Sequence, residues 1–192
     1  MRCFNCGKEL AEGFDRCPHC GASTSYSGID SIKEATTLNT QGNMLAAQGK
    51  QAEAIEAYRA ALARFPDYAV CHYNLGLALQ ALKDYEDAIE SFGLAIQLKS
   101  DFAAAYTGRG DALLGLGLSQ EAIADYSKAI ELYPDYAVAY FKRGEVFSEV
   151  EELAASLADF KSYLTYKPHD ARAKRRVKQL RELSGAWSPD DD

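Results

Sequence analysis

The sequence has few of the groups that catalysis or membrane insertion requires. No apolar run in its 192 residues approaches the roughly 18 residues of a membrane-spanning helix. Only three histidines are present, His19, His72 and His169. Neither a glycine-rich phosphate loop nor a hydrolase serine motif occurs. With 47% hydrophobic residues and a net charge of −7, the composition is that of a soluble protein. We therefore expect a soluble, non-enzymatic protein.

Cysteine is also scarce, but four of the five cysteines fall in the first 20 residues. Met1 and Arg2 lead directly into this polar cysteine motif and not into an apolar secretory signal. We therefore expect a cytoplasmic protein whose cysteines stay reduced unless a metal holds them. The fifth, Cys71, aligns with small residues of the repeats described below, and we interpret it as a packed core residue.

The four N-terminal cysteines form two Cys-x-x-Cys pairs, Cys3 with Cys6 and Cys17 with Cys20. Each two-residue gap allows a tight turn that directs both thiolates at one tetrahedral zinc ion. A glycine follows each pair and supplies the backbone freedom of such a turn. The spacing resembles compact N-terminal zinc ribbons, so we predict a ribbon over residues 1–21. Four thiolates leave no open coordination position, so Zn²⁺ would be structural.

Two alternatives to zinc remain at this stage. Two disulfides would satisfy the same four cysteines, although a cytoplasmic location disfavours them. A redox-active Cys-x-x-Cys pair would require a thioredoxin-like βαβ context, and the sequence around the pairs does not indicate one.

One pattern recurs four times in the rest of the chain. Its glycines stand 34 residues apart without insertions: Gly42, Gly76, Gly110 and Gly144. Twelve residues after each glycine comes a small residue: Ala54, Ala88, Ala122 and Ser156. Four residues later comes an aromatic: Tyr58, Phe92, Tyr126 and Phe160. The units end near Pro66, Ser100, Pro134 and Pro168.

Apolar residues within each unit recur at helical spacing, for example from Ala69 to Leu82 and from Tyr85 to Leu98. Each unit therefore reads as two short helices, which are marginal alone and must pack on their neighbours. The glycine and the small residue would lie where the helices approach most closely, with the aromatic ring beside them. The pattern resembles the tetratricopeptide repeat. That resemblance implies an all-α, right-handed superhelix of four repeats, at 35–68, 69–102, 103–136 and 137–170.

The flanks of the repeats differ in composition. Residues 22–30 are mostly small and polar and are interpreted as a flexible linker. Ser31 and Glu34 have the spacing of a capping box, so the repeat region, 31–170, should begin with a helix near Ser31. Residues 35–170 hold 11 basic and 19 acidic residues. Residues 171–184 follow as a basic capping helix, and 185–192 as an acidic tail.

In tetratricopeptide repeats the first helix of each repeat lines a concave groove that binds peptides. The resemblance therefore predicts the following groove residues in this chain: Asn39, Asn43, Tyr73, Asn74, Leu77, Thr107, Asp111, Phe141 and Lys142. Tyr73 and Phe141 could equally be packing residues between repeats. Basic side chains of the cap would extend the groove and favour acidic ligand residues: Arg172, Arg175 and Arg176.

Some members of the family bind the C-terminal carboxylates of chaperone tails. Asn43 and Asn74 match the two asparagines of that site, but its cationic positions hold Asn39, Ala104 and Gly108. Without the cations the charge-assisted hydrogen bonds are missing, so we do not expect this ligand.

The sequence thus predicts an adaptor that binds a protein or peptide, with the ribbon as a second contact. One alternative is a factor associated with nucleic acid, transcription or translation that uses the ribbon and the cap. It is disfavoured because residues 1–34 carry four basic and five acidic residues. Another alternative is a regulatory subunit of an enzyme complex.

Overall fold

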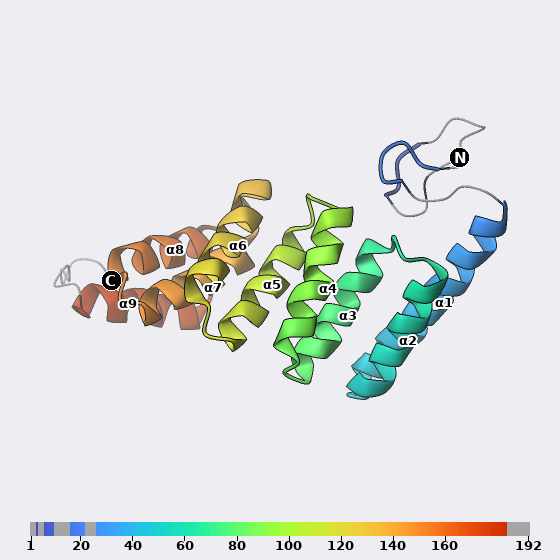
Figure 1. Ribbon diagram of the computed structural model, residues 1–192. Coiled ribbons are helices and arrows are strands. Elements are labelled where there is room, and N and C mark those ends of the chain that lie inside the picture. The colour runs from blue at the N-terminus through green and yellow to red at the C-terminus, as the bar shows by residue number, and fades with distance from the viewer. Residues whose placement is uncertain (1–2, 4–5, 10–15, 22–25, 184–192) are drawn as a thin grey trace. The chain divides into compact units, whose positions relative to one another are not determined.

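The computed structural model describes residues 3, 6–9, 16–21 and 26–183. These residues form nine helices and no extended strand; Glu9 and Arg16 are in isolated β-bridges. The helices are α1 (Tyr26–Ala47), α2 (Gln51–Arg64), α3 (Ala69–Ala81), α4 (Tyr85–Leu98), α5 (Ala103–Gly115), α6 (Ser119–Leu132), α7 (Ala137–Glu149), α8 (Leu153–Tyr166) and α9 (Ala171–Leu183). The predicted all-α repeat fold is confirmed (Figure 1). Within the described part, no helix combines the length and apolar character that crossing a membrane needs.

The chain divides into two compact units, residues 1–112 and 113–192. In the first unit α1 packs on α2, α2 on α3, and α3 on α4. In the second unit α6 packs on α7, α7 on α8, and α8 on α9. Each unit is therefore a stack of antiparallel helical pairs, in which a helix contacts its neighbours in the sequence (Figure 1). The division falls within α5 and so does not follow the repeat boundaries.

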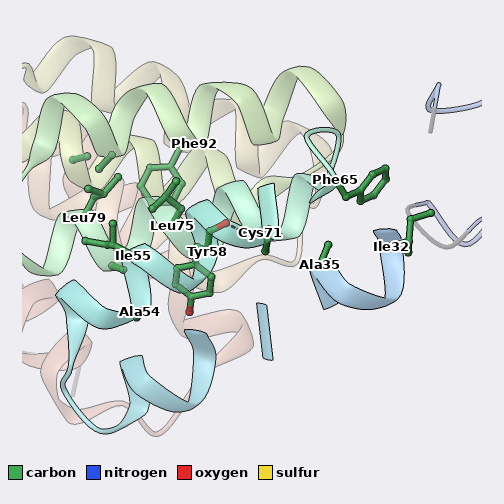
Figure 2. Packing of buried hydrophobic residues seen from close by; sticks show 14 of the residues in the cluster. Ile32, Ala35, Ala54, Ile55, Tyr58, Phe65, Cys71, Leu75, Leu79 and Phe92 are labelled. Atoms are coloured by element: carbon green, nitrogen blue, oxygen red, sulfur yellow. Dashed lines mark hydrogen bonds between the residues drawn. The ribbon is translucent and has the colours of Figure 1, made fainter. Parts of the chain in front are cut away.

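The glycines of the first two repeats lie directly against aromatic rings. A Cβ atom added at Gly42 would come within 2.5 Å of the ring of Tyr58, and one at Gly76 within 2.8 Å of the ring of Phe92. Both rings are fully enclosed, with exposed fractions of 2% and 0% (Figure 2). Since real Cβ atoms do not approach so closely, only glycine fits at these two positions, and the predicted close contact is confirmed for the first two repeats.

The small residues twelve positions later are buried as predicted. Ala54, Ala88, Ala122 and Ser156 each have an exposed fraction of 0%. Ser156 adds a hydroxyl that must be satisfied inside the protein, and it donates a 2.7 Å hydrogen bond to the carbonyl oxygen of Gly144. The repeat therefore accepts serine at this position because the neighbouring backbone supplies an acceptor.

The turns between paired helices share one backbone conformation. Gly49, Lys83, Gly117 and Glu151 stand 34 residues apart and all have positive φ, between 63° and 79°. In the second turn the backbone N–H of Asp84 donates to the carbonyl of Leu79, as in the usual left-handed helix ending. Lys83 and Glu151 adopt a conformation that glycine tolerates better.

The first helix begins earlier than the sequence indicates. α1 starts at Tyr26, five residues before Ser31, so part of the expected linker is helical; residues 22–25 lie outside the described residues. Ser31 and Glu34 lie inside the helix, and Glu34 pairs with Arg64 at 3.0 Å. The capping-box spacing therefore does not mark a helix start here, and the Glu34 carboxylate pairs with α2 instead.

The C-terminal helix follows the repeat pattern for one further period. Ala173, Val177 and Leu180 are buried and stand 34 residues after Ala139, Arg143 and Val146 of α7. The three residues pack in a cluster with Phe160 of α8. α9 therefore occupies the position of the first helix of a fifth repeat. Lys178 stands where each of the four repeats has its recurring glycine. The expected acidic tail, 185–192, lies outside the described residues.

Candidate functional site

The four N-terminal cysteines form one cluster. Their sulfur atoms all lie within 4.8 Å of one another. Cys3 Sγ is 3.5 Å from Cys20 Sγ, and Cys6 Sγ is 3.7 Å from Cys17 Sγ. A tetrahedral zinc ion with Zn–S bonds of about 2.3 Å places its sulfurs about 3.8 Å apart. Two of the sulfur contacts are thus close to the tetrahedral spacing, and each of them joins one Cys-x-x-Cys pair to the other.

The backbone around the cluster has the turns predicted from the glycines. The N–H of Gly7 donates to the carbonyl of Cys3, and the N–H of Gly21 to that of Cys17, each at 2.8 Å. Both glycines have positive φ, 71° and 73°. Burial disfavours the Cys17 thiolate, but hydrogen bonds from the His19 backbone, the Cys3 thiol and Cys20 outweigh it and lower the pKa of Cys17 to about 7. The turns thus favour the ionised form that binds metals.

The cysteine cluster is not separate from the helices of its unit. Cys3 and Cys17 are buried members of the same hydrophobic cluster as Ile32, Ala35 and Phe65. The sequence interpretation predicted only a flexible linker, 22–30, between the ribbon and the repeats and did not foresee this packing. It could not, because nothing in the spacing of the cysteines indicates which helix they contact.

In the first unit, α1, α2 and α3 surround a hollow of about 240 Å³ lined by Asn43, Tyr58, Asn74 and Leu77 among others. The hydroxyl of Tyr58 donates a 2.8 Å hydrogen bond to Asn43 Oδ1, which leaves the amide N–H groups of Asn43 outside this bond. Asn74 Nδ2 donates to Asn39 Oδ1 at 3.0 Å. Leu77 is 41% exposed. The hollow therefore combines amide groups with apolar surface.

Two predicted groove residues in this unit are not open to a ligand. Asn39 and Thr107 are each 5% exposed. Thr107 Oγ1 donates to the carbonyl of Ala104 at 2.9 Å, as a helical threonine commonly does. Both side chains are therefore part of the wall behind the surface. Asp111 of α5 is partly exposed.

Tyr73 packs against two other aromatic rings and is partly exposed. Its ring lies 4.9 Å from that of Phe102 and 5.8 Å from that of Phe92, measured between centroids. Such tilted pairs stabilise by roughly 0.5–1.5 kcal/mol beyond simple burial. The packing interpretation of Tyr73 therefore has direct support, while its half-buried ring still forms part of the surface.

In the second unit, α9 contributes to the same face as α7. Arg172 pairs with Glu145, and its guanidinium lies 4.8 Å from the centroid of the Phe141 ring. Phe141 in turn packs against Phe160 and Tyr163. The structure thus brings Arg172 and Phe141 together as predicted, and adds Glu145 as a partner that partly neutralises the arginine.

The other predicted cations of this face differ in their surroundings. Arg175 is exposed, and its Nε donates to the carbonyl of Ala171 at 3.3 Å. Arg176 is half-buried and donates to Gln179 Oε1 at 3.4 Å. Lys142 is half-buried on α7. The hydrogen bonds of Arg175 and Arg176 do not involve a carboxylate. The charges of these two arginines are therefore not neutralised by these partners.

The sequence interpretation missed a buried ion pair in the second unit. Arg143 donates two hydrogen bonds of 2.7 Å to Asp159, and a third of 2.8 Å to Ser127 Oγ. The side chains are 19% and 6% exposed. The Asp159 carboxylate raises the pKa of Arg143. The sequence did contain a signal for this pair: Arg143 is charged, whereas the same position of repeat two holds Leu75.

Cys71 and His72 both lie in packed, hydrogen-bonded surroundings. Cys71 is fully buried, donates to the carbonyl of Tyr58, and has its pKa raised to about 12 by burial. His72 Nε2 lies 2.8 Å from the carbonyl oxygen of Pro66. The interpretation of Cys71 as a small packed residue is confirmed.

Comparisons with known proteins agree with this geometry. A family model described as TPR repeat matches residues 42–83, and one described as tetratricopeptide repeat matches residues 73–137. Residues 42–137 therefore carry tetratricopeptide repeats. Neither match includes the cysteine segment. A search of curated proteins found no significant match.

Three solved structures illustrate the similarity. The crystal structure of MamA protein is 27% identical with a TM-score of 0.72, covering 80% of this chain and 84% of that one. The first TPR of Spaghetti (RPAP3), bound to the HSP90 peptide SRMEEVD, is 29% identical with a TM-score of 0.61, covering 62% and 95%. The second TPR domain of human RPAP3, in complex with the HSP70 peptide SGPTIEEVD, is 27% identical with a TM-score of 0.59, covering 60% and 97%.

Proposed function

We propose that this protein is a non-enzymatic adaptor that binds a peptide or protein segment on the exposed face of the first helices of its repeats. The observation that supports this most is the hollow between α1, α2 and α3, where Asn43, Asn74 and Leu77 offer amides beside apolar surface. Extended peptides need such amides for their backbone and apolar contacts for their side chains. The two RPAP3 structures hold peptides on the same repeat fold.

The ligand we propose differs from the chaperone peptides of those structures. Asn74 Nδ2 donates to Asn39, which stands at a position where carboxylate-binding members of the family have a cation. A terminal carboxylate in this hollow would find amides but no charge, and charge-assisted hydrogen bonds are roughly twice as strong as neutral ones. An internal peptide segment is therefore the better match.

Site-specific photocrosslinking tests the proposed surface. A benzophenone amino acid replaces Leu77, which is 41% exposed in the hollow, or Leu94 of α4, which is 38% exposed elsewhere. Peptides selected from a random library should crosslink from position 77 and not from position 94, and Asn74→Ala should weaken them. Equal crosslinking from both positions would place the ligand elsewhere and overturn the proposal.

In the second unit we propose that Lys142, Arg172, Arg175 and Arg176 favour acidic residues of the ligand. Reversing these four charges should lower the affinity for an acidic peptide and flatten its salt dependence, because exposed charges act over about 10 Å at 0.1 M salt. Unchanged affinity and salt dependence would exclude this role.

We further propose that Cys3, Cys6, Cys17 and Cys20 hold a structural Zn²⁺, with sulfur spacings as the supporting geometry. The ion would fix the two turns to each other and present the ribbon as a second contact module. Titration with Co²⁺ should give a one-to-one tetrahedral thiolate spectrum that Cys17→Ser changes. A protein that takes up no Co²⁺ in reducing buffer would refute the site.

A further inference from the structure

In the repeat alignment, one side of α9 corresponds to the side of α7 that packs on α8. The residues on this side of α9 have a different chemistry from those of α7. In α7, Tyr140 stacks on Tyr166 of α8, and Gly144 lies against Phe160 of α8. This side of α7 is therefore covered by the helix that comes next in the chain. The residues 34 positions later on α9 are Lys174 and Lys178. Where α7 has an aromatic ring and a glycine, α9 therefore has two lysines. A second helix packed closely on this side of α9 would bury two ammonium groups.

The cations on this side have no carboxylate partner within the described part of the chain. Lys174, Arg175 and Lys178 are exposed, and their three- and four-residue spacings make them neighbours on the helix surface. Elsewhere in the unit, Arg143 pairs with Asp159 and Arg172 with Glu145. The surface formed by Lys174, Arg175 and Lys178, the α9 cationic face, is therefore suited to a cluster of carboxylates.

The chain itself carries such a cluster a short distance further on. Asp190, Asp191 and Asp192 are consecutive, and Asp190 is the seventh residue after the last residue of α9, Leu183. Seven extended residues span about 24 Å. Lys174 lies nine residues before Leu183, which is about 14 Å along the helix axis. All three cations are therefore within reach, and such a short connection raises the effective concentration of the aspartates to about the millimolar range.

We propose that Asp190–Asp192 folds back onto the α9 cationic face, on the side that a second helix covers in the repeats. This contact goes beyond the proposed function and also bears on it. Arg175 belongs to both surfaces, and Arg172 and Arg176 are its neighbours on α9. The acidic segment therefore competes with an acidic ligand for the cationic surface of the second unit.

Trp187 makes the contact measurable in the whole protein, because it is the single tryptophan of the chain and lies three residues before Asp190. At about 0.05 M salt the fluorescence anisotropy of Trp187 should be higher in the unchanged protein than in the Asp190→Asn, Asp191→Asn, Asp192→Asn variant. Raising the salt to about 1 M, where screening acts within about 3 Å, should remove the difference. The charge-reversed variant Lys174→Glu, Arg175→Glu, Lys178→Glu should match the tail variant at low salt.

A matched control reverses two exposed lysines of the same unit that lie outside the α9 cationic face, Lys161 and Lys167. This control should keep the anisotropy of the unchanged protein. Equal anisotropy in the unchanged protein and the tail variant at low salt would overturn the proposal. The tail variant changes no residue of the helical stack, so that outcome cannot be attributed to unfolding.

Competition is measured separately with a fluorescent oligoglutamate peptide. Neutralising Asp190–Asp192 should raise the affinity for this peptide several-fold. The anisotropy of Trp187 could respond as expected while the peptide binds neither the unchanged protein nor the neutralised variant. That result would support the contact of the acidic segment with α9 and would refute the proposed acidic ligand. If the peptide binds both proteins equally, the competition between the segment and the ligand is excluded.

Discussion

Arg143 and Asp159 join α7 to α8 through two parallel hydrogen bonds of 2.7 Å, and a third bond from Arg143 reaches Ser127 on α6. The pair is largely shielded from water. A buried ion pair stabilises little beyond an apolar pair of the same shape, but the loss of one partner leaves a charge without compensation. This pair therefore fixes how three helices meet, at the cost of sensitivity to substitution.

The first prediction concerns this pair. Asp159→Ala should lower the free energy of unfolding by about 2–4 kcal/mol, since it leaves the Arg143 guanidinium buried and unpaired. Urea titration followed by circular dichroism measures the change. Repeat two holds Leu75 and Ser91 at the same positions. The double variant Arg143→Leu, Asp159→Ser should therefore recover most of the loss, and a double variant as unstable as the single one would contradict this account.

The second prediction concerns the close helix contact. Ala88 is fully buried. Ala88→Leu should overpack this contact and cost about 1–3 kcal/mol. Thermal unfolding measures the effect, with Ala60→Leu at an exposed position of α2 as the control. An unchanged melting temperature for Ala88→Leu would contradict the alignment of the repeats.

The third prediction concerns the turns between paired helices. Lys83 and Glu151 have positive φ, 66° and 63°, where the other two turns have glycine. Replacing either residue by glycine should raise the free energy of unfolding by roughly 0.5–1 kcal/mol, because relief of the left-handed strain exceeds the added chain entropy. The reciprocal change Gly49→Lys should destabilise, and the urea midpoints of the three variants provide the measurement.

The sequence indicated the helical repeats and the cysteine site well, because their determinants are local. The glycines near Tyr58 and Phe92 and the turns at Gly7 and Gly21 follow from short spacings that allow one geometry. The start of α1 and the pairing of Arg143 with Asp159 were missed because they depend on contacts with other helices. The burial of Thr107 was missed for the same reason, since a helical position alone does not say which side chain the neighbouring helix covers.

The fourth prediction concerns pH. Within the described residues, the buried Nδ1 of His72 has no hydrogen-bond partner, while Nε2 contacts the Pro66 carbonyl. Burial lowers the pKa of His72 below its ordinary value, against smaller opposing effects of Pro66 and Asp67. The unfolded chain therefore binds a proton at higher pH than the folded protein does. The contribution of neutral His72 to the free energy of unfolding is therefore present above the unfolded pKa of about 6.5. It is lost as the pH falls through the pKa of the folded protein.

His72→Gln isolates this effect, because the glutamine amide can still donate to the Pro66 carbonyl but does not titrate. The unchanged protein should lose more stability than the variant between about pH 7.5 and 5.5, a range above the titration of ordinary carboxylates. Urea midpoints at both pH values give the comparison. His19 and His169 are exposed and present in both proteins, so their contributions cancel. Equal losses in the two proteins would refute the role of His72.

The fifth prediction follows from the position of the cysteine cluster. Cys3 and Cys17 share a buried cluster with Ile32 and Ala35 of α1 and with Phe65. Chelation of the proposed zinc should release the ribbon and uncover this part of α1. Amide hydrogen exchange should therefore accelerate at the cysteine turns and in α1 near Ile32, while the amides of α7 to α9, in the other unit, keep their rates. Total helical circular dichroism should change little, because the other helices retain their pairs.

Two outcomes would contradict this prediction. Exchange that accelerates only within residues 1–21 would mean that the ribbon contributes nothing to the stability of α1. A cooperative loss of all helices would mean that the metal stabilises every helix.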